Sequence, residues 1–150
     1  MDFNTRICTT LEQSERLLAL GLKKETADCR LIGLVKDARG KDIPKKKQVW
    51  SIRASESEHA MSCGFMRYSF IPAWSLHRLM ELCSKSLYMS DSANAHYRMT
   101  ASWLEVIYIR DDKRWMRRFM EGNIYDRMID MIKLFIENDY FNKEYLEETE

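Results

Sequence analysis

The residues that most resemble a set of metal ligands lie in one stretch, Glu56-Ser57-Glu58-His59, with Cys63 four positions after the histidine. On a helix, His59 and Cys63 would share a face, because side chains four residues apart are neighbours there. Carboxylate, imidazole and thiolate groups are all zinc ligands, but a structural zinc site uses four of them. The chain has no C-x-x-C pair that could complete such a set. We therefore interpret this stretch as a solvated polar loop and predict no metal.

A cysteine–histidine nucleophile is the next chemistry that the residue types allow. His77 and Cys83 fall on one expected helix, but they are six positions apart, so they point to different sides. A nucleophile and its base must lie within hydrogen-bond reach of each other. His77 and Glu81, four apart, are typical of a polar pair on a helix surface. The chain also lacks the G-x-S-x-G, G-x-G-x-x-G and P-loop motifs. These absences favour a protein that is not an enzyme, with no catalytic residue and no cofactor.

Two basic segments could instead bind nucleic acid. Residues 36–53 hold seven Lys or Arg against two Asp, a net +5, and residues 110–118 hold five against two, a net +3. We expect both to be hairpins, and Trp50 and Trp115 lie within them, where rings could stack on bases. Alternatively, the cations only protect strand edges, since the whole chain has a formal net charge of +1. The candidate nucleic-acid contacts are Lys45, Lys46, Lys47, Arg114, Arg117 and Arg118.

Length and composition indicate one ordinary folded domain. The chain has 150 residues, of which 45% are hydrophobic and 31% charged, with 5 Gly and 2 Pro. Such a chain can bury a full core and is neither low-complexity nor disordered in composition. We expect a single globular domain over residues 1–150. Its last few residues, about 143–150, could fray, because residues 137–150 carry six acidic side chains and one lysine.

The sequence predicts a cytoplasmic protein without a membrane segment. The first residues lack the basic and apolar regions of a signal peptide. The longest uncharged apolar-rich run, 68–76, is far shorter than the roughly 20 residues of a spanning helix. The four cysteines, in a chain of this length without an export signal, are interpreted as free thiols that pack as small hydrophobes.

A first helix is expected over residues 10–20. Thr9 followed by Glu12 matches a capping box, in which each side chain accepts a hydrogen bond from the other residue's backbone. Gly21 then suits the left-handed position after a helix end.

Two further helices follow later in the chain. One is predicted over about 72–83, because Pro72 fits a first helical position and apolar residues follow at helical spacing. The other begins after Asn123, the expected N-cap, and ends near Asn138, with apolar residues repeating every three or four positions.

Extended segments are predicted at 29–35, 48–53, 65–71, 97–110 and 115–120. The longest, 97–110, alternates apolar and polar residues at first and then becomes apolar on both faces. Three helices are too few to cross over between four parallel strands. We therefore predict an α+β fold, with a mostly antiparallel sheet of about four to five strands and three helices packed on one face.

Two groups of short motifs resemble a known family. The first is CTTLEQS at 8–14 with LGL at 20–22 and TAD at 26–28, and the second is IPAWSL at 71–76. In order and spacing they resemble a family of small uncharacterised proteins of gut anaerobic bacteria, their phages and their mobile elements. The helix after the Gly-Asn step is similar too, whereas the lysine run and residues 54–64 and 115–120 depart from the pattern. That family has no assigned activity, so the resemblance implies only a prokaryotic accessory protein.

Three hypotheses about function follow. The first is a non-enzymatic accessory or interaction protein of a mobile element or phage, with a protein partner or self-association into a homo-oligomer. The second is a weak nucleic-acid-binding protein that uses the basic hairpins 36–53 and 110–118. The third and least favoured is an enzyme or small-ligand pocket near Trp74, whose ring is more typical of a core residue.

Overall fold

Helices and small sheets alternate along the chain in this computed structural model, which describes residues 7–53, 65–89, 95–99, 103–110 and 113–148. The helices are α1 (Leu11–Ala19), α2 (Leu76–Met89) and α3 (Ile124–Glu137), and the strands are β1 (Cys29–Lys36), β2 (Trp50–Arg53), β3 (Arg67–Ala73), β4 (Ala95–Met99), β5 (Leu104–Arg110) and β6 (Lys113–Phe119). Among the described residues, no helix has the length and apolar character needed to cross a bilayer.

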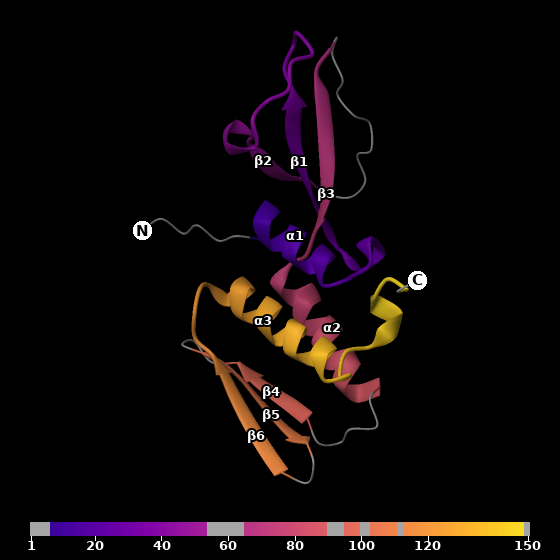
Figure 1. Cartoon of the computed structure of the whole chain (residues 1–150), viewed down its shortest axis with the longest axis vertical. Coiled ribbons are helices and arrows are strands. Elements are labelled where there is room, and N and C mark those ends of the chain that lie inside the picture. Colours follow the sequence, from indigo (N-terminus) through magenta and orange to yellow (C-terminus); the bar gives the residue numbers. More distant parts are fainter. Residues whose placement is uncertain (1–6, 54–64, 90–94, 100–102, 111–112, 149–150) are drawn as a thin grey trace.

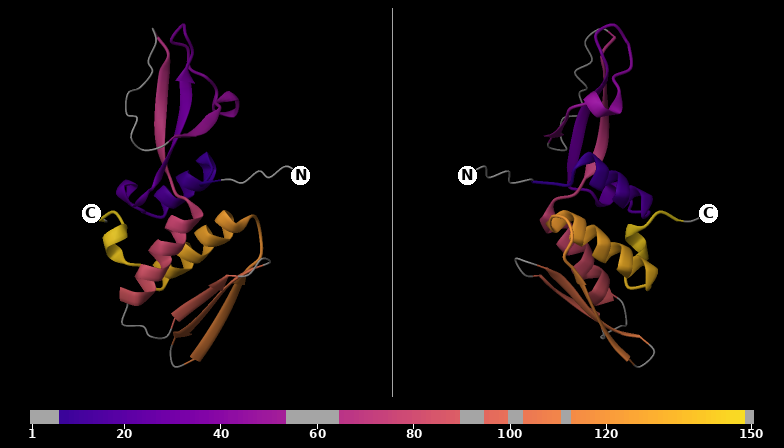
Figure 2. Two further views of the ribbon diagram at one scale, coloured as in Figure 1. Left: turned by 180° about the vertical axis from the view of Figure 1, so that it is seen from behind. Right: turned by 60° about the vertical axis from the view of Figure 1, so that its left-hand side comes forward.

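The strands form two separate antiparallel sheets. One has the order β2-β1-β3 and the other the order β4-β5-β6. They lie at opposite ends of the long axis of the molecule, with the three helices between them (Figure 1). The α+β class and the antiparallel pairing are confirmed, but the prediction of one sheet of four to five strands with all helices on one face is wrong. The physical reason is the course of α2, which carries the chain from the end of β3 to the opposite end of the molecule (Figure 2). The strands that follow α2 therefore lie too far from the first sheet to pair with its edges.

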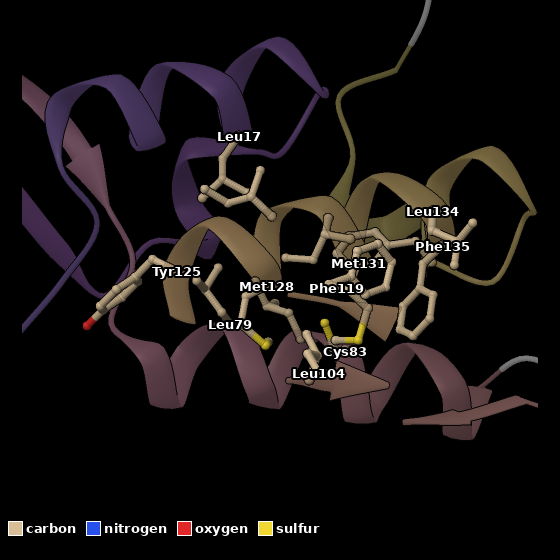
Figure 3. Close-up of a cluster of buried hydrophobic side chains, with 14 of the residues drawn as sticks. Leu17, Leu79, Cys83, Leu104, Phe119, Tyr125, Met128, Met131, Leu134 and Phe135 are labelled. Carbon is tan, nitrogen blue, oxygen red and sulfur yellow. The ribbon is translucent and has the colours of Figure 1, made fainter. Parts of the chain in front are cut away.

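The large core lies between the three helices and the inner face of the second sheet. Leu17 from α1, Leu79 from α2 and Leu104 from β5 are fully buried there. Met128 and Phe135 come from α3, whose apolar side lies at the centre of the cluster (Figure 3). The sequence periodicity of this helix therefore predicted its buried side correctly.

A smaller cluster joins α1 to the first sheet. Its buried members are Cys8, Leu31 and Ala73, and Leu11 of α1 packs against them. Since α1 also contributes Leu17 to the large core, this short helix links the two sheets through its two apolar sides.

The capping box of α1 uses different residues from those predicted. Thr10 Oγ1 accepts from the Gln13 backbone N–H at 3.3 Å, and Gln13 Oε1 accepts from the Thr10 N–H at 3.0 Å. The predicted pair of Thr9 and Glu12 is wrong, because Thr9 is buried and its hydroxyl lies 2.8 Å from that of Ser14 and accepts from the Trp74 N–H at 3.1 Å. Tertiary hydrogen bonds thus occupy the hydroxyl of Thr9, and the next residue, Thr10, caps the helix.

The start of α2 also differs from the prediction. Pro72 belongs to β3, where it is the register partner of Arg30, and not to the helix. β3 is an edge strand, and proline, which lacks an N–H, is tolerated at edges. The helix begins at Leu76, after Ser75, whose Oγ accepts from the Arg78 N–H at 3.1 Å.

The predicted long strand 97–110 is two strands. β4 and β5 are antiparallel partners, with Met99 opposite Leu104. The alternating part of the pattern thus begins in β4, and the continuously apolar part belongs to β5. The predicted partner strand 115–120 is confirmed as β6, and Asn123 is confirmed as the N-cap of α3.

The acidic C-terminal segment folds back onto the N-terminal half. Leu146 forms a bridge with Leu22, and the Glu147 N–H donates to the Gly21 carbonyl at 2.7 Å. These contacts place residues 146 and 147 beside the end of α1.

Candidate nucleic-acid interface

The two faces of the second sheet differ in chemistry. On the inner face Leu104, Val106 and Phe119 are buried in the core. Alternate residues along a strand point to opposite faces, so the intervening residues form the outer face. Among the described residues, no helix covers this face (Figures 1 and 2). Six described side chains line it: Arg98, Glu105, Ile107, Arg114, Met116 and Arg118.

Glu105 is the centre of a cross-strand ion triplet on the outer face. It is the register partner of Arg98 on one side and of Arg118 on the other. Arg98 Nη2 donates to Glu105 Oε2 at 2.8 Å, and Arg118 Nε donates to Oε1 at 3.0 Å. These hydrogen bonds, that of Arg118 most of all, hold the pKa of Glu105 below its ordinary value although burial opposes the shift. Glu105 is therefore ionised and only 2% exposed, beneath two arginines whose side chains are 67% and 48% exposed.

Arg118 is held from a second direction by an aromatic ring. Its guanidinium carbon lies 5.2 Å from the ring centroid of Trp103, within the range of a cation–π contact. The hydrogen bond to Glu105 and this contact together orient the guanidinium plane. Arg118 is therefore a preorganised cation rather than a freely moving one.

The remaining residues of the face add one cation and an apolar pair. Arg114 is exposed near the start of β6, four residues before Arg118. Between them lie Ile107 and Met116, which are register partners, and Met116 is 59% exposed. The six side chains surround a cavity of about 350 Å³. Three arginines against one glutamate leave this face with a positive charge.

The predicted nucleic-acid contacts fall in three different places. Arg114 and Arg118 lie on the outer face just described. Arg117 points to the other side of the sheet, with its guanidinium carbon 5.3 Å from the ring centroid of Phe119. The three lysines 45–47 form a short 3₁₀ turn beside the first sheet, far along the molecule from β6 (Figure 1). The two basic segments therefore do not form one surface.

The lysine turn borders a cavity of about 820 Å³ between the first turns of α1 and α3. Its wall carries Lys45 and Lys46 but also Glu15 and Asp126. Lys45 Nζ donates to Glu15 at 2.8 Å, so part of its charge is already balanced. This mixed-charge cavity is a poorer match for a polyanion than the outer face of the second sheet.

Arg98 is the cation of the outer face that was not among the predicted residues. It stands in the alternating stretch that follows residue 97, at a polar position, so its outward direction could have been predicted. The neighbours of Arg98 could not have been predicted, because they come from β5 and from β6, which lies on the other side of β5.

The other chemistries considered from the sequence find no site among the described residues. Glu56, Glu58, His59 and Cys63 lie outside the described ranges. The described part of the chain contains no group of three or more His, Cys, Asp or Glu that could hold a metal ion. Glu81 pairs with Lys85 at 2.7 Å and with Arg78 at 2.6 Å, and these bonds lower its pKa to about 2.

The thiols of Cys8 and Cys83 and the ring of Trp74 are buried, whereas His77 is exposed on α2. Burial raises the pKa of the Cys83 thiol, which is the opposite of what activates a nucleophile. Burial also raises the pKa of Cys8 to about 12. Trp74 is 0% exposed, and its indole N–H donates to Thr26 Oγ1 at 3.0 Å. The Trp74 ring is therefore a core group and does not line an open site.

Comparison with protein-family models, curated proteins and solved structures gives no match for this chain. The resemblance to small proteins of gut anaerobes and their phages stays a prediction.

Proposed function

We propose that this chain is a non-enzymatic binding protein that holds the phosphate backbone of a nucleic acid on the outer face of β4-β5-β6. The observation that carries the proposal is the position of Arg98, Arg114 and Arg118 on one open face whose single described acid, Glu105, is buried beneath two of them. A positively charged surface binds nucleic acid by releasing the counterions around the phosphates.

The test is binding of a fluorescent oligonucleotide, followed by anisotropy at about 50 and about 200 mM salt. We expect binding that weakens with salt, because about three phosphate contacts correspond to a slope of log K against log salt of about −2 for a single strand. Arg114→Glu is the informative variant, since Arg114 is exposed at the rim of the face.

Two matched controls reverse the same charge elsewhere. Arg117→Glu lies on the same strand but on the other face, and Lys46→Glu lies in the lysine turn beside the first sheet. We expect Arg114→Glu to weaken binding about tenfold and each control by less than about twofold. Arg117 points to the opposite side of the sheet and cannot contact a ligand on the outer face, and Lys46 lies far along the molecule, where salt screens its charge. No binding at about 50 mM salt, or equal losses for all three variants, would contradict the proposal.

A second candidate function is association with a protein, either a partner or another copy of this chain. Two exposed apolar side chains favour it: Trp115 in β6 and Met120 directly after β6. β6 is an edge strand of its sheet, so one of its edges is open. Edge strands with apolar side chains are templates for pairing. Light scattering that gives a strict monomer, together with no partner in pull-downs, would count against it.

The biological context is also a proposal. The resemblance described above favours an accessory protein of a mobile element or phage that works in the cytoplasm. Nucleic acid is the phosphate polymer that such a protein would meet there.

A further inference from the structure

We propose that the outer face is built for a single strand rather than a duplex, with unpaired bases lying on Ile107 and Met116 between the arginines. This inference rests on the proposed function and names its ligand class. It starts from the apolar pair at the centre of a charged face.

The apolar pair is hard to explain by phosphate binding alone. Ile107 and Met116 face each other across β5 and β6, and Met116 is 59% exposed to solvent. Phosphate oxygens gain nothing from a thioether or an isoleucine side chain, whereas a base has a flat apolar face. Binding a base would remove both side chains from water, which is favourable in proportion to the area covered.

The spacing of the cations leaves room for bases between them. Arg114, Met116 and Arg118 are alternate residues of β6 and so lie on one face, about 7 Å from one to the next. A ligand that crosses the face along β6 would meet a cation, an apolar side chain and a second cation in turn. An extended strand with alternating phosphates and bases presents both kinds of group to one surface.

Arg118 offers a further surface for a base. Its guanidinium carbon lies over the Trp103 ring, 5.2 Å from the centroid, while its side chain remains 48% exposed. Bases stack on guanidinium planes as well as on aromatic rings. A base placed on the exposed side would lie against a guanidinium that Trp103 and Glu105 already hold.

A duplex fits this face less well. The major groove is about 12 Å wide and admits two strands of a sheet. Three strands at about 4.8 Å spacing, with their side chains, are wider than that. A duplex could therefore touch the arginines only with its outer phosphates and would leave Ile107 and Met116 uncovered.

The experiment compares three probes by competition against a labelled 12-nucleotide single strand. The probes are the unlabelled single strand, the duplex of the same sequence, and inorganic polyphosphate of similar charge. We expect the single strand to compete at least about tenfold better than either other probe, since removing roughly 60 Å² of apolar surface from water on Ile107 and Met116 supplies about that factor.

Two variants locate the effect on the face. Met116→Ala is expected to weaken single-strand binding about three- to tenfold and to leave the salt slope unchanged, because it removes apolar contact and no charge. Met120→Ala is the matched control, since Met120 is 61% exposed but does not line the cavity. Circular dichroism verifies that both variants fold.

The outcomes separate this inference from the proposed function. Equal or better competition by the duplex or polyphosphate, with Arg114→Glu still weakening binding, would overturn the single-strand inference and leave phosphate binding in place. Equal losses for Met116→Ala and Met120→Ala would also overturn it. Absence of binding by all three probes at about 50 mM salt would overturn the proposed function itself.

Discussion

The side-chain amide of Gln13 in α1 donates to the carboxylate of Asp126 in α3, with 2.8 Å between Nε2 and Oδ1. Each residue is the third residue of its helix and the second member of that helix's capping box. Gln13 Nε2 also lies 3.2 Å from Oδ1 of Asn123, the N-cap of α3. The first turns of two helices more than 100 residues apart in sequence are thus joined through their caps. Residues that stabilise each helix locally also set how the two helices meet.

Replacement of Gln13 by alanine should lower the free energy of unfolding by about 2 kcal/mol, because it removes the Gln13 half of the capping box and a part-buried inter-helix hydrogen bond together. Gln13 is only 4% exposed, so water cannot replace its partners fully. Urea unfolding measures the effect. Glu12→Ala is the matched control in the same turn, and we expect it to change stability by less than about 0.5 kcal/mol because Glu12 is exposed. A larger loss for Glu12→Ala than for Gln13→Ala would contradict the capping box described above.

Thr26→Val should destabilise the protein by about 1–3 kcal/mol, because it leaves the indole N–H of Trp74 buried without its acceptor. Valine has nearly the shape of threonine, so the change tests the hydrogen bond rather than the packing. Thr26→Ser keeps the hydroxyl and should recover most of the loss. Both variants are compared by urea unfolding, and equal destabilisation by valine and serine would show that the Thr26 methyl group, and not the hydroxyl, matters.

Gly33→Ala should destabilise the first sheet by about 1–3 kcal/mol through overpacking. A Cβ atom at Gly33 would clash with the ring of Trp50, its register partner on β2. The same substitution should cost much less in a Trp50→Ala background, where the ring is gone. A double-mutant cycle measured by urea unfolding gives the coupling between the two positions. Additive effects would mean that the ring moves aside without cost.

Glu105 should make the thermal stability of the protein depend on pH in acidic solution. Hydrogen bonds from Arg118 and then Arg98 hold its folded-state pKa below the ordinary value of 4.5. A depressed pKa means that the carboxylate stabilises the fold at any pH above the unfolded-state value, and that this stabilisation is lost as the pH falls through the folded-state pKa. Glu105→Gln should therefore have a lower Tm than the parent chain at neutral pH. The Tm difference should shrink below about pH 4.5, and a difference that stays constant down to about pH 3 would contradict the ion triplet.

Several elements could be predicted from local sequence because the interactions that define them are local. The apolar period after Asn123 predicted α3, its N-cap and its buried side. The run rich in Leu, Ile and Val that forms β1, and β6 as the partner of β5, were also predicted close to their observed bounds. In each case the pattern is complete within a few residues of the chain, and no distant contact competes with it.

Predictions failed where a distant partner decided between two local options. Thr9 and Thr10 could each cap α1, but the backbone N–H of Trp74 donates a hydrogen bond to the hydroxyl of Thr9, so Thr10 became the cap. Pro72 could begin a helix or end an edge strand, and pairing with β1 made it a strand residue. Local propensity could not choose, because the competing states differ by about one hydrogen bond, which is small beside a tertiary contact.

The amino-acid sequence alone determined the α+β class, the three helices and the antiparallel character of the strands, because periodicity, caps and turn residues act over a few positions. Only the tertiary structure decided that the strands divide into two sheets and that the basic segments lie apart. It also decided that Arg98, Arg114 and Arg118 share a face with a buried glutamate. These relationships depend on which strands pair and on where α2 carries the chain. Such choices are made by burial and hydrogen bonding between residues far apart in sequence.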